Sequence, residues 1–385
     1  MRVLIFTADI GEGHDLPARM LRDAIAARRP DAEIVILDSI ETSGPVARAI
    51  LRNGAEFLLG RLPWLFDLQY WLVARFPPTR RLGRRLAIAL GLRKLLEAVA
   101  RHRPDVIVAT YPGANEVLSH ARQTGRLDVP VASAITDLAA LGYWAHPGCD
   151  LHLVIHPESE AEIRAIAGAG ARIEAVRGLT TPGFDVPVDP AQARAALGLP
   201  ADGRVVVVSG GGWAVGDLRG AVTAALAAAP DVHAVALCGR NDAVRRSLER
   251  AFAGDRRVTV MGFTDRMSDV LAAADVLVHS TAGLTVLEAL IRGARVISYG
   301  WGVAHIRINN RAYAGFGLAD VVADPRALTP AIRRALASPR RPDLSYGQRP
   351  HAADRVLALA GVAGGTLQPG DRTRGAEQAA PGQHQ

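Results

Sequence analysis

The chain has 385 residues, a formal net charge of +7 and a hydrophobic content of 49%. That length suits two domains rather than one. The basic balance favours an anionic partner, such as nucleic acid, anionic lipid or a phosphorylated ligand. The two cysteines, Cys149 and Cys238, lie far apart and imply no disulfide framework. The sequence predicts neither a cleavable signal peptide nor a membrane-spanning helix, because the apolar start at Val3–Phe6 is too short for the first and no run of about 18 apolar residues occurs for the second.

Short apolar strands alternate with helical stretches along the whole chain. In the first half they are predicted at Arg2–Thr7, Glu33–Asp38, Val106–Thr110, Val131–Thr136 and Leu151–His156. In the second half they are predicted at Arg204–Ser209, His233–Leu237, Val258–Met261, Val276–His279 and Arg295–Ser298. Most are continuous Val, Ile and Leu runs, which is typical of strands buried on both faces. The pattern predicts an α/β fold with two doubly wound, Rossmann-like domains whose parallel sheets face a cleft.

The stretch GLTTPGFDVPVDP interrupts this rhythm and predicts a linker, because proline and glycine are concentrated in it. A short helix is predicted within the linker at Ala191–Leu197. The predicted parts are an N-terminal domain (1–178), the linker (179–203), a C-terminal domain (204–345), a closing helix (346–363) that could belong to either domain, and a disordered tail (364–385) without apolar periodicity.

Residues 41–105 are too many for one crossover helix between the second and third strands. Their first part holds six of the nineteen aromatic residues, and their second part, from Arg75 to Arg103, has nine basic residues against one acid, Glu97. Apolar side chains beside a cationic stripe suit the surface of an anionic membrane. A helical insertion with buried aromatics and solvated arginines is an equally good interpretation at this point. No nucleic-acid-binding motif is present, so nucleic acid is not expected as a partner. The candidate membrane and acceptor residues are Trp64, Phe66, Trp71, Arg80, Arg81, Arg84 and Arg85.

The stretch TADIGEGH leads the first strand through a glycine turn into a helix. Such a turn lies at the carboxyl edge of a parallel sheet, where α/β proteins bind ligands. The match to G-x-G-x-x-G is partial, since Leu16 replaces the third glycine. His14 would project from the helix start into the cleft, where an ordinary pKa of about 6.5 suits a general base. A flexible turn with an incidental histidine is the alternative.

Two similar turns occur in the second half of the chain. The stretch SGGGWAVGDL, with Gly211 and Gly212, allows a ligand to approach the backbone just before a helix N-terminus, which favours negative charge. The stretch HSTAGLTVLEAL forms a small-residue nest suited to a diphosphate. Glu288, on the following helix, could accept hydrogen bonds from ribose hydroxyls or only complement the helix dipole. For SGGGWAVGDL, a tight turn without a ligand is the alternative.

The order and spacing of several stretches resemble the GT-B glycosyltransferases. These stretches are TADIGEGH, ITDLAALGYWAHPGCDLHLVIHPESE, VVVVSGGGW, MGFTDRMSDVLAAADVLV, AGLTVLEALIRGARVISY and NNRAYAGFGLA. Within that class the chain is similar to the monogalactosyldiacylglycerol synthase and processive diacylglycerol glucosyltransferase group, which is related to MurG. The resemblance covers most of residues 1–325.

The resemblance implies roles for individual residues. His14, or alternatively Asp137 in ITDL, would take the proton from the acceptor hydroxyl. The implied donor-binding residues are Gly211, Gly212, Phe263, Ser280, Thr281, Ala282, Gly283, Thr285, Glu288, His305 and Asn309. Among them Phe263 would lie near the base, Glu288 would bind the ribose of UDP, and Asn309 would sit in the sugar-binding loop. The chain departs from the family pattern at Leu141, Ser280–Ala282 and His305, which leaves the sugar open.

The resemblance also implies a reaction: inverting transfer of a hexose from a UDP-sugar to a lipid such as diacylglycerol, without cofactor or metal. The chain has no D-x-D pair. The enzyme would be cytoplasmic and peripheral to the inner face of the cell membrane, which favours the membrane interpretation of residues 41–105. The alternatives are a soluble natural-product glycosyltransferase, a UDP-sugar epimerase and a non-catalytic sugar-nucleotide binder.

The stretch HPGCDLHLVIH holds four residues of types that bind zinc, at His146, Cys149, His152 and His156. On a strand, His152 and His156 would be about 13 Å apart, which is too far to share one ion. We therefore expect loop and strand residues rather than a zinc site.

Overall fold

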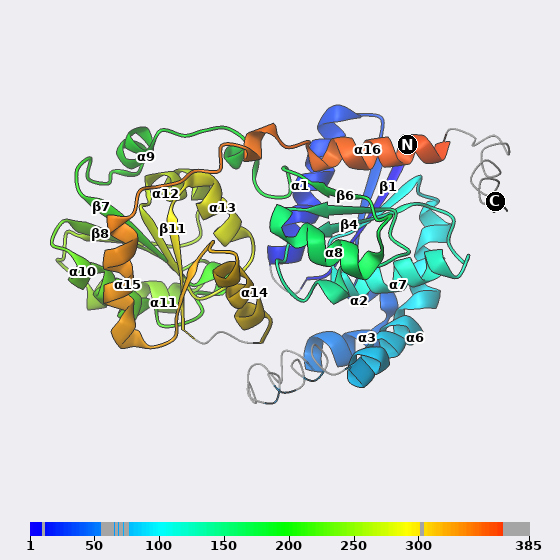
Figure 1. Ribbon diagram of the computed structural model, residues 1–385, viewed down its shortest axis with the longest axis horizontal. Helices are drawn as coiled ribbons and strands as arrows, with labels where there is room; N and C mark the ends of the chain where they lie inside the picture. Colours follow the sequence, from blue (N-terminus) through cyan, green and yellow to red (C-terminus); the bar gives the residue numbers. More distant parts are fainter. Residues whose placement is uncertain are drawn as a thin grey trace, which may run out of the picture.

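The computed structural model describes residues 1–9, 12–54, 65, 68, 72, 77–300 and 304–364. Two α/β domains lie side by side, each with a parallel six-stranded sheet (Figure 1). The strands of the first domain are β1 (Arg2–Thr7), β2 (Glu33–Asp38), β3 (Val106–Ala109), β4 (Val131–Ile135), β5 (Leu151–Val154) and β6 (Ile173–Ala175). Those of the second are β7 (Arg204–Ser209), β8 (Val232–Leu237), β9 (Val258–Met261), β10 (Val276–His279), β11 (Arg295–Tyr299) and β12 (Asp320–Val322). The predicted α/β fold with two parallel sheets is confirmed.

The strand order places one topological switch point in each sheet. The first sheet runs β2-β1-β3-β4-β5-β6, so the order reverses between β1 and β3. The second runs β12-β11-β10-β7-β8-β9, so it reverses between β7 and β10. In open α/β sheets the connections diverge there and leave a crevice at the carboxyl ends of the strands. All three glycine-containing turns singled out in the sequence follow β1, β7 or β10 and therefore lie at these switch points.

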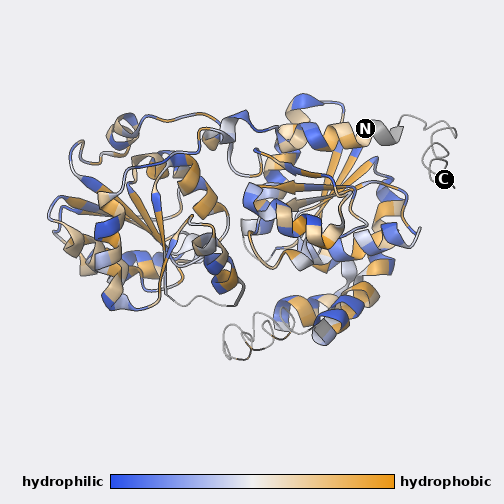
Figure 2. Ribbon diagram, in the orientation of Figure 1, coloured by the Kyte–Doolittle hydropathy of each residue, from blue (hydrophilic) through white to orange (hydrophobic). Residues whose placement is uncertain are grey.

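Helices cover both faces of each sheet, and the strands are mostly apolar (Figure 2). The helices of the first domain are α1 (Glu12–Arg28), α2 (Ser39–Ser43), α3 (Pro45–Arg48), α6 (Pro77–His102), α7 (Pro112–Gln123) and α8 (Glu160–Ala167), with a π-helical turn η1 (Ala49–Asn53). Those of the second are α10 (Leu218–Ala228), α11 (Asp242–Ala251), α12 (Met267–Ala273), α13 (Leu284–Arg292), α14 (Ala304–Gly315) and α15 (Pro325–Ala337). Burial of both strand faces explains the continuous apolar runs.

Two segments connect the domains. Within the predicted linker, α9 (Pro190–Leu197) packs against α12 of the second domain, and Arg194 pairs with Asp275 there. The closing helix α16 (Ala352–Gly364) returns to the first domain, where Asp354 pairs with Arg28 of α1 (Figure 1). The sequence left the domain of this helix open, and the contacts assign it to the first. The tail beyond residue 364 lies outside the described residues.

The short edge strands β6 and β12 were not predicted. Each has three residues and pairs on one side only, with β5 and β11 respectively. Three residues are too few to show an apolar run. Each strand also lies at the edge of its sheet, where water reaches one side, so its residues need not be apolar. Among the described helices, none is long and apolar enough to cross a membrane.

Candidate active site

His14 lies at the switch point of the first sheet. It follows β1 on the first turn of α1, and its Nδ1 lies 2.9 Å from the carbonyl oxygen of Thr110, just after β3. A carbonyl oxygen can only accept a hydrogen bond, so Nδ1 carries the proton. The lone pair of Nε2 is therefore left to accept a proton, as a general base requires. The contact across the switch point fixes both the ring and its tautomer.

The surroundings of His14 are largely aromatic. The ring of Tyr111 meets it edge-on at 5.4 Å between centroids, and the ring of Trp144 lies at 5.8 Å. Desolvation lowers the pKa of His14 below 6.5, while the charge of Asp137, the Thr110 carbonyl and the charge of Asp15 oppose that shift. A histidine with a lowered pKa is neutral at pH 7 and so ready to take a proton.

Asp137 follows β4, and both of its carboxylate oxygens have partners. Nε1 of Trp144 donates to Oδ2 at 2.9 Å, and Nδ2 of Asn309 lies 3.3 Å from Oδ1. The carboxylate therefore acts on His14 through its charge, since the two residues share no hydrogen bond in the part of the chain described. This arrangement favours His14 over Asp137 as the base and gives Asp137 the position of a counter-ion.

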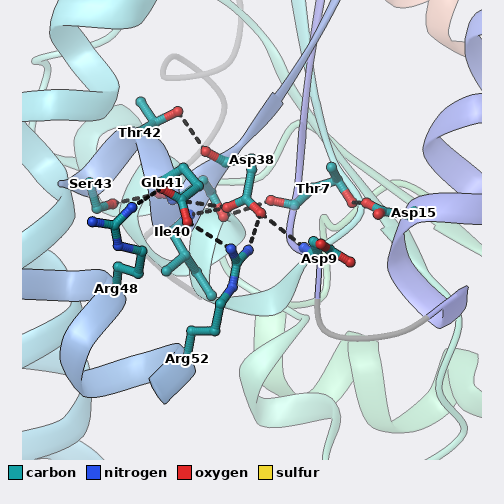
Figure 3. Close-up of polar contacts among 11 residues, drawn as sticks. Thr7, Asp9, Asp15, Asp38, Ile40, Glu41, Thr42, Ser43, Arg48 and Arg52 are labelled. Atoms are coloured by element: carbon teal, nitrogen blue, oxygen red, sulfur yellow. Dashed lines mark hydrogen bonds and ion pairs between the residues drawn. The ribbon is translucent and has the colours of Figure 1, made fainter. Parts of the chain in front are cut away.

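Figure 3 shows how the first helices of the insertion are tied to the same sheet edge. Asp38, at the end of β2, caps α2 through the backbone N–H groups of Ile40 and Glu41, and its Oδ2 pairs with Arg52 of η1 at 2.5 Å. Arg52 also pairs with Glu41 at 2.7 Å. Asp38 is therefore occupied by structural contacts, and η1 is anchored beside the turn that carries His14.

The second switch point brings the other two glycine turns together. The hydroxyl of Ser280 donates to the carbonyl of Val215, and a Cβ built on Gly211 would lie 3.3 Å from Thr281. Gly211 has φ = +67°, a conformation that favours glycine. Ser280 thus holds the turn after β10 against the turn after β7, and the predicted donor-binding residues Gly211, Ser280 and Thr281 form one surface.

The N-terminus of α13 opens onto this surface. Its N-cap, Gly283, has φ = +98° and lacks a side-chain capping bond, and a Cβ built there would meet no atom within 4 Å. An uncapped helix N-terminus with open space before it can receive an anionic group. Ala282 and Thr285, on either side of this start, are half-buried.

Glu288 points away from water. It is 5% exposed, and its Oε1 accepts a hydrogen bond from the hydroxyl of Thr180 at the beginning of the linker. Burial raises its pKa to about 7. The carboxyl therefore links α13 to the segment that joins the two domains.

Exposed aromatic residues border the same edge of the second sheet. Phe263 follows β9 and is 59% exposed, and the guanidinium of Arg240 lies 4.0 Å from its ring centroid. The backbone N–H of Arg240 donates to the carbonyl of Gly212, and the adjacent Trp213 is 73% exposed. Aromatic faces beside a glycine turn suit stacking on a planar base. Phe263 and Gly212 thus belong to one surface.

The remaining predicted residues are placed as follows. Asn309, on α14, is 2% exposed and contacts the first domain, where its Oδ1 accepts from the backbone N–H groups of Leu138 and Ala139 at 2.9 and 3.0 Å. The side chain of His305 and the residues Trp64, Phe66 and Trp71 lie outside the described residues. The residues predicted to bind the acceptor and those predicted to bind the donor thus lie on different sheet edges, one in each domain. Helix α14 of the second domain connects the two edges through Asn309.

The four arginines of α6 that were predicted to contact a membrane do not share one environment. Arg84 pairs with the buried Glu116 of α7, and Arg80 lies close to the backbone of Gly142. Arg81 and Arg85 are exposed and form no ion pair with any residue that the structure describes. All four are exposed, but Arg80 and Arg84 also contact the first domain.

The candidate zinc ligands have other partners. Nε2 of His152 accepts from the backbone N–H of His146 at 3.3 Å, and Nε2 of His156 lies 3.0 Å from the hydroxyl of Tyr313. Within the described ranges no group of three His, Cys, Asp or Glu side chains could hold a metal ion.

Sequence reasoning missed several residues at these edges: Thr110, Tyr111, Trp144, Thr180, Trp213 and Arg240. Thr110 ends a predicted strand and Tyr111 follows it, so placing that strand beside the first one would have found them. Trp144, Thr180 and Arg240 belong to the site through tertiary contacts, for which the sequence gives no local signal.

Two family models match the chain, one in each domain. Residues 14–176 match the model described as Monogalactosyldiacylglycerol (MGDG) synthase, and residues 206–338 match Glycosyl transferases group 1. Together with the two Rossmann-like domains and their facing switch points, these matches define the chain as a glycosyltransferase of the GT-B fold. The resemblance to the monogalactosyldiacylglycerol synthase and diacylglycerol glucosyltransferase group is confirmed.

Curated relatives and solved structures agree with this class. The processive diacylglycerol beta-glucosyltransferase of Bacillus subtilis (strain 168) is 25% identical over 304 residues, 77% of either chain. The protein of the same name from Bacillus pumilus (strain SAFR-032) is 22% identical over 83% of either chain. MurG of Acinetobacter baumannii superposes with a TM-score of 0.56 at 14% identity, over 94% of this chain and 99% of MurG, which supports the fold.

Proposed function

We propose that this glycosyltransferase moves a hexose from a UDP-sugar to a lipid alcohol such as diacylglycerol at a membrane surface, with inversion and without a metal ion. The observation that carries the proposal is the fixed tautomer of His14, whose Nε2 is the free base at the first switch point. The names of the two relatives support the lipid acceptor and the hexose. The open N-terminus of α13 supports a donor with a diphosphate.

The reaction follows from these positions. Nε2 of His14 takes the proton of the acceptor hydroxyl as its oxygen forms a bond to the anomeric carbon. The bond from that carbon to the UDP oxygen breaks on the opposite face, and its electron pair leaves with UDP. The turn Ser280–Gly283 and the helix start behind it stabilise the charge that develops on the diphosphate, which is electrostatic catalysis by fixed donors. Asp137 stabilises the imidazolium that His14 becomes.

The surface of the first domain supports the membrane part of the proposal. Among the described residues, every exposed large apolar side chain of that domain lies between residues 46 and 86; these are Val46, Ile50, Leu68, Leu82 and Leu86. Arg81 and Arg85 are exposed beside Leu82 and Leu86 on α6. An apolar patch bordered by arginine is the pattern of a helix that lies in the interface of an anionic bilayer.

UDP release tests the proposal. The protein is mixed with UDP-galactose, UDP-glucose or UDP-N-acetylglucosamine and with anionic vesicles that do or do not contain diacylglycerol. We expect release from one donor only when diacylglycerol is present. His14→Ala should reduce turnover by a factor on the order of 10² to 10⁴ while donor binding is retained. The matched control is His102→Ala at the end of α6.

Other outcomes would change the account. Release that does not depend on diacylglycerol would move the acceptor to a soluble molecule. Donor conversion without any acceptor would indicate an epimerase. Binding of UDP without turnover would indicate a sugar-nucleotide binder.

A further inference from the structure

Asn309 is the residue through which the second domain reaches the acceptor edge of the first. Asn309 is 2% exposed and belongs to α14, a helix on the side of the second domain that faces the first (Figure 1). Its Oδ1 accepts from two consecutive backbone N–H groups, those of Leu138 and Ala139, and its Nδ2 faces Asp137. The side chain of Asn309 thus contacts three consecutive residues of the first domain.

The contacts of Asn309 fix the direction of its amide. Two N–H donors point at one atom, so that atom is the oxygen, and the nitrogen must be the atom that faces the carboxylate. The turn that it holds is an unusual one, because Ala140 has φ = +55°, in the left-handed region that non-glycine residues seldom adopt. A side chain from the other domain therefore stabilises the turn that begins with Asp137.

The turn is important because it places the charge of Asp137 near His14. Its other oxygen accepts from Nε1 of Trp144, whose ring lies 5.8 Å from that of His14. The groups around His14 are Asp137 from the β4 turn, Asp15 from α1, and Tyr111 and the Thr110 carbonyl from the β3 turn. Of the two charged groups, Asp137 has the greater influence on His14. It is also the one held from the second domain.

We propose that Asn309 is a positioning residue that holds Asp137 as the counter-ion of the imidazolium that His14 forms. His14 then has this fixed counter-ion only while the two domains are in contact. The proposal rests on the function proposed above for His14. It gives Asn309 a role toward the acceptor edge in addition to the predicted one in the sugar-binding loop. When the domains part, Asp137 loses this contact, and His14 loses the support of a fixed charge.

A histidine titration tests the proposal without any substrate. The full chain is labelled with ¹³C at histidine Cε1, and the His14 resonance is identified by its absence in His14→Gln. We expect Asp137→Asn to lower the pKa of His14 by about one unit, since an opposite charge favours the protonated form. Asn309→Ala should lower it in the same direction, by about half a unit or more. In the Asp137→Asn background, Asn309→Ala should cause no further shift.

Two further variants separate positioning from a merely structural role. Tyr313→Phe removes the contact to His156, another link from α14 to the first domain, without removing a hydrogen bond to Asp137 among the described residues, and it should leave the His14 titration unchanged. Asn309→Asp keeps the shape and the acceptor for the two N–H groups, and it should raise the pKa of His14 because it adds a second carboxylate. Asn309→Asp is the variant to titrate if Asn309→Ala fails to fold.

Three results would overturn the proposal. The first is an unchanged His14 titration in Asn309→Ala. The second is an equal shift with and without the Asp137 carboxylate, and the third is an equal shift in Tyr313→Phe. Because the titration needs neither donor nor lipid, it can fail while lipid glycosylation is observed, and it can succeed while the acceptor proves to be another molecule.

Discussion

At the scale of single residues, the site depends on which atom carries a proton. His14 was predicted as the base from its place in a glycine turn, and the structure adds the Thr110 carbonyl that fixes the tautomer. The sequence could not show this contact, because the two residues are 96 positions apart. The same holds for Glu288: its place on the helix was predicted, but its burial against Thr180 depends on the linker.

The protonation of Glu288 gives a stability prediction. Burial raises its pKa from 4.5 to about 7, so the folded protein favours the neutral acid. The stability that this provides is complete below pH 4.5 and is lost as the pH rises through about 7. A glutamine side chain at this position would not titrate and would keep an acceptor for Thr180. Relative to the parent, Glu288→Gln should therefore gain about 5 °C in melting temperature between pH 5 and pH 8.

Thermal melting of the ligand-free protein at both pH values measures this gain, with Glu160→Gln on α8 as the control. A melting difference that is the same at pH 5 and pH 8 would show that Glu288 is already ionised in the folded protein.

At the scale of elements, the predictable parts were those with long apolar runs. Ten strands were predicted from such runs, and ten appear with ends within two residues; Thr110, Thr136 and His156 fall just beyond the strands, at the ligand-binding edge. The edge strands β6 and β12 were missed because they are short and half-solvated. On α6 the charge pattern predicted a basic stripe, but only tertiary contacts separate Arg84, which pairs with Glu116, from its exposed neighbours.

The difference between the paired Arg84 and its neighbours Arg81 and Arg85 gives a prediction for membrane binding. Arg81 and Arg85 lie one turn apart on the exposed face of α6, and each arginine close to an anionic bilayer contributes about 1 kcal/mol. The variant with both Arg81→Gln and Arg85→Gln should bind vesicles with anionic lipid about 30-fold more weakly, measured by co-sedimentation at low salt. Arg93→Gln on the same helix, where Arg93 pairs with Glu97, is the matched control and should bind normally. Equal losses in both variants, or no loss in either, would contradict a membrane contact at this face.

At the scale of the whole molecule, the two switch points explain why the glycine turns lie far apart in the chain but belong to two facing edges. The parallel sheets were predictable from the run of strands, and the domain class from the order of motifs. How the domains meet was not, because Asn309 with Asp137 and Tyr313 with His156 are pairs that no local pattern connects. We expect acceptor and donor to react between these two edges, with the exposed face of α6 in contact with the membrane.

The most direct test of that account is the fate of the sugar. UDP-hexose labelled in the sugar is incubated with the protein and anionic vesicles that contain diacylglycerol, and the lipid phase is extracted and analysed by mass spectrometry and NMR. The account predicts a labelled glycosyl diacylglycerol whose glycosidic bond is inverted relative to the donor, and no such product from His14→Ala. Label that stays in water as a soluble glycoside, or a lipid product with retained configuration, would contradict it.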